Sequence, residues 1–309
     1  MFYSTISILV GIAAFVDASC MHATSKLQRR VTPEGGVEVS TFGYTDLIGP
    51  LNWAALDAEN SACTTGTVQS PINIDETIPI TSEAPIINFP SVESAEFENL
   101  GSTVEVIVNG TTQFAGVDFE LKQFHFHTPS EHRIHEEYYP LEMHMVHEAA
   151  DGSGAVAVLA IVFDLSTDGS TTDLLTRVTE HLDEIATPGT VTETAALDFE
   201  ELAHHLTTTP LFQYTGSLTT PPCAEGITFL LTEEPLPIDV ATYNALKSVI
   251  KFNSRFTQNK LGNGNLLLLE NNLQLGIETN AIHPSLAEAH EDPVMDAALA
   301  LMSAIAAVH

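Results

Sequence analysis

The sequence contains few basic residues: ten Lys and Arg stand against 41 Asp and Glu, for a formal net charge of −31 at pH 7. A surface this acidic repels nucleic-acid phosphates and anionic lipid, so we expect neither as a partner. Charged residues form only 17% of the chain and hydrophobic residues 44%. This composition excludes a disordered chain, because enough apolar surface can be buried to offset the cost of ordering it.

Apolar runs long enough to span a bilayer are also missing. The run at 6–16, followed by Val16-Asp17-Ala18, is typical of a secretory signal peptide, which we expect over residues 1–18. No basic residue precedes this run, so a buried N-terminal strand is the alternative. Removal of a signal peptide would make this a secreted, extracellular protein. The polar residues 19–40, which include the pair Arg29-Arg30, are typical of a linker or a pro-segment.

The C-terminal residues 272–309 predict a helical extension that docks on the body or stays partly disordered. Its apolar end, residues 297–308, is too short for a transmembrane helix. A removable lipid-anchor signal is the alternative, although the polar spacer of such signals is not evident here. We therefore expect no membrane span.

Cysteine is scarce, with three residues in the chain. Cys20 lies at the boundary of the predicted signal peptide, which leaves Cys63 and Cys223 as the pair of the mature chain. In an oxidising compartment such a pair usually forms a disulfide. A pair of free buried thiols is the alternative.

Between residues 42 and 269 the sequence consists mainly of short alternating or apolar runs separated by turn signals, with no internal repeat. We predict strands over 119–127, 141–149, 155–163, 212–217 and 227–231, and helices over 173–185, 199–205 and 240–250. Strand runs joined by short polar turns favour a mainly β (α+β) fold, with a large, mostly antiparallel sheet and short peripheral helices. We expect it to form one domain over residues 41–271.

The dipeptide Asn109-Gly110 follows the apolar run 105–108 and predicts the turn of a β-hairpin. Together with Thr111 it also forms a sequon for N-glycosylation. Because a hairpin tip is exposed, we expect Asn109 to carry a glycan.

The first candidate for chemistry is the segment Gln123-Phe-His-Phe-His127. Side chains alternate along a strand, so His125 and His127 share a face with Gln123, and Phe124 and Phe126 point into the core. A His-x-His pair on a strand is by itself a weak signal, since such pairs also arise by chance or in a core.

The next predicted strand places Glu142 and His144 on one face and His147 on the other, where we expect a core histidine. A turn around 136–140 would bring His144 beside the first two histidines. Three neutral imidazoles with no fourth protein ligand are the arrangement of a catalytic zinc site, whose open position holds water. Gln123 and Glu142 each precede a ligand histidine by two residues, so each can fix the second nitrogen of that ring.

Four segments carry a specific pattern: Gln69-Ser-Pro-Ile-Asn-Ile74, Phe124-His-Phe-His-Thr-Pro-Ser-Glu-His132, Glu142-Met-His-Met-Val-His147 and Gly216-Ser-Leu-Thr-Thr-Pro-Pro222. Together they resemble the α-class carbonic anhydrases, and the match runs from Phe42 to about Asn265. The resemblance implies that family's fold and the reversible hydration of carbon dioxide to bicarbonate and a proton. It also implies Zn²⁺ as the cofactor and a zinc-bound hydroxide as the nucleophile. The pair Cys63 and Cys223 resembles the disulfide of the family's secreted members.

By this resemblance the zinc ligands are His125, His127 and His144. Thr219 is expected to accept a hydrogen bond from the zinc-bound hydroxide and to donate its own proton to Glu131, because an ionised carboxylate only accepts. Thr220 matches a residue that contacts bound substrate or anion.

The resemblance further implies an apolar pocket for carbon dioxide beside the metal, lined by Val146, Val158, Leu218 and Phe229. Phe229 stands where many relatives have tryptophan. Tyr44 matches a hydroxyl of the active-site water network, and the backbone carbonyl of Asn253 would orient the second ligand histidine. Sulfonamides and small anions are the expected inhibitors, while the oligomeric state stays open.

One residue departs from the pattern. Fast members of the family carry a histidine as proton shuttle at the position of Ser102, and serine has no group that titrates near neutrality. We therefore expect a working but slower enzyme that is limited by proton transfer and helped by external buffer. A catalytically inactive binding module of the same fold and ester hydrolysis as a side activity are the alternatives. Inactive relatives typically lack a ligand histidine, and all three are present here.

Overall fold

The structure is a computed structural model that describes residues 36–268. The predicted signal peptide, Cys20, most of the predicted linker and the predicted C-terminal extension lie outside these residues. Among residues 36–268, none of the helices combines the length and the hydropathy that crossing a bilayer requires.

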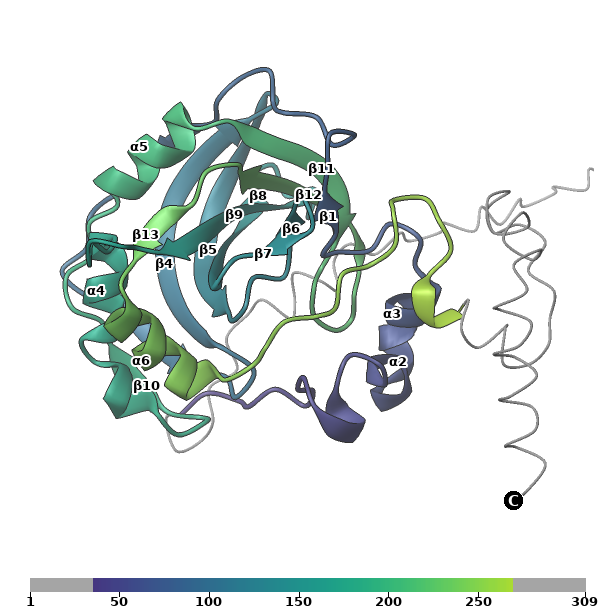
Figure 1. Cartoon of the computed structure of the whole chain (residues 1–309), viewed down its shortest axis with the longest axis horizontal. Helices are drawn as coiled ribbons and strands as arrows, with labels where there is room; N and C mark the ends of the chain where they lie inside the picture. The colour runs from purple at the N-terminus through teal and green to yellow at the C-terminus, as the bar shows by residue number, and fades with distance from the viewer. Residues whose placement is uncertain (1–35, 269–309) are drawn as a thin grey trace, which may run out of the picture.

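A ten-stranded sheet forms the centre of the molecule (Figure 1). Its main path runs in the order β10 (Val191–Glu193), β3 (Glu96–Asn99), β4 (Val104–Phe114), β5 (Val117–His127), β8 (Leu141–Ala149), β9 (Val156–Leu165), β12 (Glu225–Thr232) and β11 (Leu211–Ser217). Off this path, β2 (Ile86–Asn88) pairs with β4, and β13 (Leu236–Ile238) pairs with β9. All pairs are antiparallel except those of β12 and β13 with β9, which confirms the predicted sheet.

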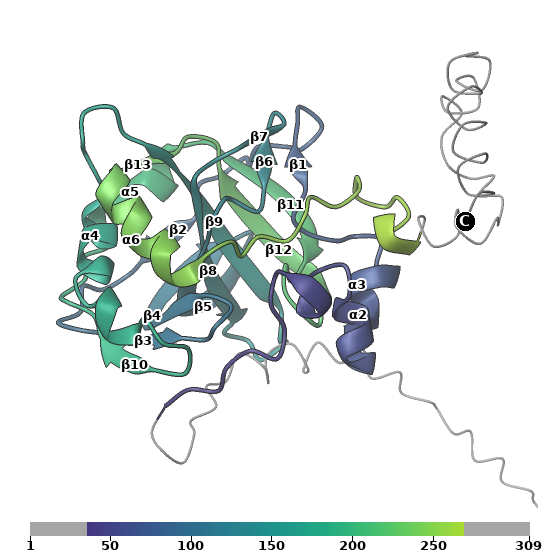
Figure 2. The same cartoon turned by 60° about the horizontal axis from the view of Figure 1, so that its bottom comes forward.

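A second, three-stranded sheet consists of β1 (Asn73–Ile74), β6 (Arg133–Ile134) and β7 (Glu137–Tyr138). The described residues include the helices α2 (Trp53–Leu56), α3 (Ala62–Thr65), α4 (Asp173–Thr179), α5 (Glu200–Thr208) and α6 (Val240–Ile250). Short 3₁₀ turns are η1 (Asp46–Ile48), η2 (Ala58–Ser61) and η3 (Leu182–Ile185). Helices α4, α5 and α6 lie together, whereas α2 and α3 lie at the opposite side of the molecule (Figure 2).

The two faces of the central sheet bury different sets of side chains. One face packs Phe124, Phe126 and Met145 against α4, α5 and α6 in the larger hydrophobic core. The other face packs residues such as Val158 and Phe229 against the small sheet. The second face is only partly covered, because a cavity lined by Val158 and Phe229 opens on it. The candidate site lies in this cavity.

A β-bulge in β5 decides which residues face the site. Leu121 and Gln123 pair with consecutive residues of β8, which leaves Lys122 as an extra residue. A bulge of this kind shifts the alternation by one residue. Leu121 and Phe124 both point into the larger core as a result. From Gln123 onward the odd-numbered residues therefore face the opposite side, as the sequence pattern predicted.

The hairpin turn predicted at Asn109-Gly110 is wrong, because β4 continues through both residues and forms a bulge there. Gly110 is needed for a close approach: a Cβ at this position would lie 2.6 Å from the ring of Phe89. The chain reverses instead at Ala115 and Gly116, whose positive φ angles of 51° and 77° suit a two-residue type I′ turn. Asn109 is nevertheless exposed, so its proposed glycosylation does not depend on a hairpin tip.

The predicted helix over 173–185 is interrupted, since α4 ends at Thr179 and η3 follows separately. The hydroxyl of Thr179 donates to the carbonyls of Leu175 and Thr176. Hydrogen bonds of this kind compete with those of the helix backbone and weaken its end. The predicted helix over 240–250 coincides with α6.

The predicted disulfide between Cys63 and Cys223 is present and joins residues 160 positions apart in the sequence. Cys63 lies in α3, and Cys223 lies between the ends of β11 and β12. The bridge therefore ties the N-terminal helices to the loop that carries Thr219 and Thr220.

Replacing both Cys63 and Cys223 with serine is expected to lower the free energy of unfolding by about 2–5 kcal/mol, because the unfolded chain regains the freedom that the bridge removes. Urea denaturation followed by fluorescence measures this change. A loss below about 1 kcal/mol in the double variant would contradict the expectation. The single variant Cys223→Ser, which leaves one free thiol, is the control for effects of the thiol itself.

Candidate active site

Three histidines from β5 and β8 converge on the partly covered face of the central sheet. His125 lies directly opposite His144 in the ladder, and His127 follows two residues later on the same face. Their ring centroids are between 4.6 and 5.4 Å apart. One ring nitrogen of each lies within 4.8 Å of those of the other two. The convergence predicted from strand alternation is thus confirmed.

A hydrogen bond to the second nitrogen fixes the orientation of each ring. The three bonds run from His125 Nδ1 to Gln123 Oε1 (2.9 Å), from His127 Nδ1 to the carbonyl of Asn253 (2.9 Å) and from His144 Nε2 to Glu142 Oε1 (2.6 Å). These are the three partners expected from the sequence. The nitrogens that remain are Nε2 of His125, Nε2 of His127 and Nδ1 of His144.

These remaining nitrogens suit a metal ion. Nε2 of His127 is buried and has no hydrogen-bond partner among the described residues, a costly state unless a ligand completes it. Burial lowers the pKa of His127 to about 4 and, together with the neighbouring rings, holds the pKa of His125 well below its ordinary range. Burial also lowers the pKa of His144. Neutral imidazoles are the form that binds Zn²⁺, so the donor set fits this ion.

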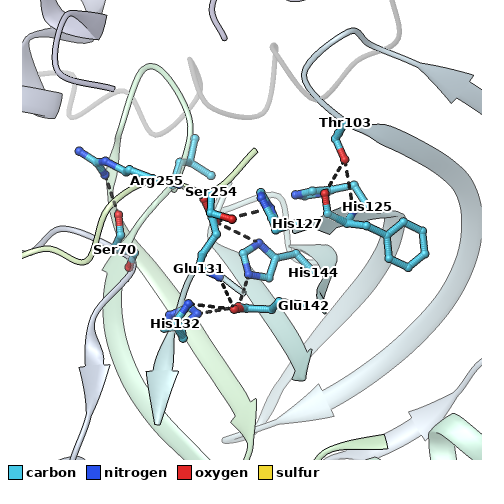
Figure 3. A network of polar contacts seen from close by, with 12 residues as sticks. Ser70, Thr103, His125, His127, Glu131, His132, Glu142, His144, Ser254 and Arg255 are labelled. Carbon is cyan, nitrogen blue, oxygen red and sulfur yellow. Dashed lines mark hydrogen bonds and ion pairs between the residues drawn. The ribbon is translucent and has the colours of Figure 1, made fainter. Parts of the chain in front are cut away.

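Glu142 links the ligand candidate His144 to His132 and to the backbone of residues 131 and 132 (Figure 3). Its Oε1 accepts from His144 and from Nδ1 of His132, both at 2.6 Å, and its Oε2 accepts the backbone N–H groups of Glu131 and His132. Burial acts to raise the pKa of Glu142, but His132 and His144 outweigh it and hold this pKa well below its usual range. The carboxylate therefore stays ionised. On the other side of His132, its Nε2 forms a hydrogen bond with the hydroxyl of Tyr214 at 2.6 Å.

The role of His132 was not resolved by the sequence. Its position next to Glu131 in the chain is visible, but its contact with Glu142 depends on the path of the intervening small sheet. His132, Glu142 and His144 also lie close enough to hold an ion. Their polar atoms, however, already hydrogen-bond to one another, so the first three histidines are the better metal site.

Glu131 is fully buried beside the three histidines. Its Oε1 accepts the backbone N–H of Arg255 at 2.8 Å, and the side chain of Thr219 acts to lower the pKa of the same carboxyl group. Its Oε2 lies 3.5 Å from Nε2 of His127 (Figure 3). Burial raises the pKa of Glu131 to about 7, against the opposing effects of His144, Arg255 and Thr219. The hydrogen bond between Thr219 and Glu131 stays a prediction.

A cavity of about 530 Å³ opens over the three histidines. It is lined by all the predicted pocket residues, Val146, Val158, Leu218 and Phe229, and by Thr219, Thr220, Tyr44 and Gln123. The ring of Phe229 stacks on that of Tyr214, with centroids 5.1 Å apart and planes 8° from parallel, which fixes its position in the wall.

Part of the cavity wall was not predicted. Ser102 lines it, as expected for the shuttle position, but its hydroxyl lies 2.7 Å from that of Ser40. Ser40 belongs to a segment, residues 37–42, that runs along the cavity and includes part of the predicted linker. Glu98 and Glu105 also line the cavity. The position of Glu105 could have been predicted by pairing the run 105–108 with the strand of His125, since Glu105 lies opposite His125.

The chain also resembles known proteins. The family model for eukaryotic-type carbonic anhydrase matches residues 48–266. A carbonic anhydrase of Klebsiella pneumoniae is 34% identical over 210 residues, which cover 66% of this chain and 81% of that protein. The structure of the fungal α carbonic anhydrase from Aspergillus oryzae shares 42% identity with a TM-score of 0.72, over 75% of this chain and 99% of its own.

An α-carbonic anhydrase from Thermovibrio ammonificans, solved with the inhibitor sulfanilamide, shares 31% identity with a TM-score of 0.64. The match covers 73% of this chain and 97% of that one. The region matched by the family model contains the central sheet and the three histidines of the candidate site. The chain therefore belongs to the α-carbonic anhydrase family.

Proposed function

We propose that the protein catalyses the reversible hydration of carbon dioxide to bicarbonate and a proton as a zinc-dependent carbonate dehydratase. The observation that carries this proposal is the set of three imidazoles at one end of a cavity, each with its second nitrogen fixed by a hydrogen bond. Three histidine ligands with one open position are the ligand set of catalytic zinc sites. Membership of the family supports the same reaction.

Zn²⁺ would be held by the nitrogens that these hydrogen bonds leave free, on His125, His127 and His144. When bound, the ion lowers the pKa of a coordinated water and so makes a nucleophile available near neutral pH. The chain itself keeps the rings neutral through burial and aligned through their partners. The ionised Glu142 also makes the ring of His144 a stronger donor to the metal.

Glu131 would determine whether the hydroxyl of Thr219 donates or accepts a hydrogen bond. In its ionised form the carboxylate of Glu131 can only accept, so the hydroxyl of Thr219 would donate to it. The oxygen of Thr219 then acts as an acceptor toward the cavity. A nucleophile that donates its remaining proton there is oriented with a lone pair toward the substrate.

Carbon dioxide is apolar, and Val146, Val158, Leu218 and Phe229 offer it an apolar wall beside the histidines. Thr220 lies in the same wall and would contact bicarbonate or a bound inhibitor. Sulfonamides and small anions are proposed as inhibitors that compete for the open metal position. The sulfanilamide complex of the Thermovibrio relative supports this expectation.

Replacing Ser102 with histidine is expected to raise turnover about tenfold at low buffer concentration, because a group that titrates near neutrality can carry the product proton out of the site. Turnover at about 1 mM and about 50 mM buffer, measured by stopped flow, tests this. At high buffer the two proteins should converge, since external base then replaces the side chain. Equal turnover at low buffer would show that Ser102 does not limit proton transfer.

Ser40 complicates this substitution because its hydroxyl contacts that of Ser102. The double variant Ser40→Gly/Ser102→His gives the new ring more space. Ser40→Gly alone is the matched control for loss of that contact.

Stopped-flow hydration of carbon dioxide, with and without a zinc chelator, tests the proposed reaction directly. Activity that disappears with the chelator and returns with Zn²⁺ would support it. Full zinc occupancy without hydration would instead favour a binding module of the same fold. Ester hydrolysis by the zinc-loaded protein, measured in parallel, would identify the side activity.

We also propose that the protein is secreted and glycosylated at Asn109. The disulfide is compatible with an oxidising compartment, and Asn109 is exposed on β4. Mass spectrometry of the protein from culture medium, before and after glycosidase treatment, tests both points. Unmodified Asn109 in the secreted protein would contradict the glycosylation alone.

A further inference from the structure

Asn253 lies in the segment that follows α6 and is buried, with 1% of the residue exposed. Its backbone carbonyl accepts the hydrogen bond from Nδ1 of His127 that orients this ring. The proposed function uses only that carbonyl. The side-chain amide of the same residue forms three further hydrogen bonds, and these point to a second role.

The three side-chain bonds of Asn253 reach the main chain on both sides of His127. Oδ1 accepts the backbone N–H of Thr128 at 2.7 Å, and Nδ2 donates to the carbonyl of Phe126 at 2.8 Å. Nδ2 donates also to the carbonyl of Ser102 at 3.1 Å. An asparagine amide has two N–H donors, and both are used here. We call these three hydrogen bonds the Asn253 clamp.

The clamp fixes the backbone of His127 against the same residue that fixes its ring. Phe126 and Thr128 are the residues directly before and after His127, so the two ends of its main chain are held by one side chain. The backbone N–H of Asn253 also donates to the carbonyl of Thr128 at 3.2 Å. Partners of this kind determine how well a ligand ring is oriented toward a metal.

The clamp also joins this strand to the turn between β3 and β4, which carries Ser102. The next residue of that turn, Thr103, donates its hydroxyl to the carbonyl of Phe126 at 2.6 Å (Figure 3). This carbonyl therefore accepts from Thr103 and from Asn253. The segments that meet here are far apart in the chain, since Ser102 and Asn253 are separated by 151 positions.

We infer that Asn253 is, through its side chain, a positioning residue for the zinc site: the clamp keeps Nε2 of His127 directed at the metal position. This nitrogen is buried and has no hydrogen-bond partner among the described residues. Its direction is therefore set by the main chain of His127 and by the bond at Nδ1, and the clamp controls both. The inference rests on the proposed function, because it requires that the three histidines bind zinc.

The variant Asn253→Ala tests this inference, because it keeps the backbone carbonyl that accepts from His127 and removes only the clamp. Release of zinc to an excess of chelator is expected to be about tenfold faster than in the wild type. The visible absorption of the Co²⁺-substituted protein, which depends on the geometry of the ligands, should change as well. A residue that serves only the stability of the fold would leave this absorption as it is in the wild type.

The matched control is Asn265→Ala. Asn265 is also buried, with 4% exposed, and uses its side chain in the same way: Oδ1 accepts the backbone N–H of Leu267, and Nδ2 donates to the carbonyls of Cys63 and Gly66. It does not line the cavity. Urea denaturation of the metal-free proteins should show a similar loss of stability in both variants. Zinc release from Asn265→Ala should nevertheless stay within about twofold of the wild-type rate, because distant sites act independently.

Zinc release from Asn253→Ala within about twofold of the wild-type rate would overturn the inference, since loss of a partner that orients a ligand normally costs more. Equally fast release from Asn265→Ala would also overturn it, because lower stability would then explain both results. A wild-type protein that binds no zinc would contradict the proposed function itself, and the inference with it.

If Asn253→Ala does not fold, Asn253→Asp takes its place. Aspartate keeps the size of the side chain and the acceptor for the N–H of Thr128, but it lacks the NH₂ group that donates to the two carbonyls. Zinc release about fivefold faster than in the wild type is expected. An unchanged rate in this variant would count against the inference.

Discussion

The variant His144→Ala is expected to lose stoichiometric zinc binding and to fall in carbon dioxide hydration by at least about 1000-fold, since a ligand is removed and not merely reoriented. The fold should survive, because the carboxylate of Glu142 keeps its bonds to His132 and to two backbone N–H groups. Zinc content by mass spectrometry, stopped-flow hydration and circular dichroism measure the three quantities on one sample.

The control for this variant is His204→Ala, which removes an exposed histidine of α5 outside the cavity. It should keep one zinc per chain and full activity. Retention of tightly bound zinc and of activity in His144→Ala would show that the three-histidine cluster is not the catalytic metal site. Loss of zinc in both variants would point to an effect on the protein as a whole.

Replacing Glu131 with glutamine is expected to lower kcat/KM by about 100- to 1000-fold while zinc stays bound. The amide oxygen of glutamine can still accept the backbone N–H of Arg255, so the buried position stays filled. Its NH₂ group, however, cannot accept, so the hydroxyl of Thr219 would be left with a single acceptor oxygen that already accepts from Arg255. The nucleophile would then lose its oriented hydrogen bond.

Hydration kinetics together with zinc content and sulfanilamide affinity distinguish this effect from a structural one. The control is Thr219→Ser, which keeps the hydroxyl and should lose less than about tenfold. Thr219→Val removes the hydroxyl and should match the loss in Glu131→Gln. If Glu131→Gln were as active as the wild type, the proposed role of the pair would be wrong.

Segments with a regular period were predicted well from the sequence. The strand over 141–149 coincides with β8, and the helix over 240–250 coincides with α6. The predictions were wrong where one local sequence pattern is compatible with two different structures. The Asn109-Gly110 pair predicts a turn, but the glycine is needed for the approach of Phe89, the residue after β2, and the local sequence does not show this contact.

The candidate site, too, was predicted from local patterns only in part. Strand alternation alone placed His125 and His127 on one face, and adding a reversal of the chain brought in His144. The contact of Asn253 with His127 spans 126 residues and was expected only from the resemblance to the family. The acidic wall of the cavity was not predicted, because no local pattern relates Glu38 to Asp57 or to Glu105.

By itself, the sequence determined the charge balance of this protein, its main strands and the three histidines that share one face, since these depend on composition and on the two-residue period of a strand. Only the tertiary structure decided that a bulge at Lys122 sets which residues of β5 share that face, that buried Glu131 lies beside His127, and that acidic residues line the cavity. Each of these depends on segments far apart in the chain. Their meeting is set by the packing of the whole sheet and not by any local preference.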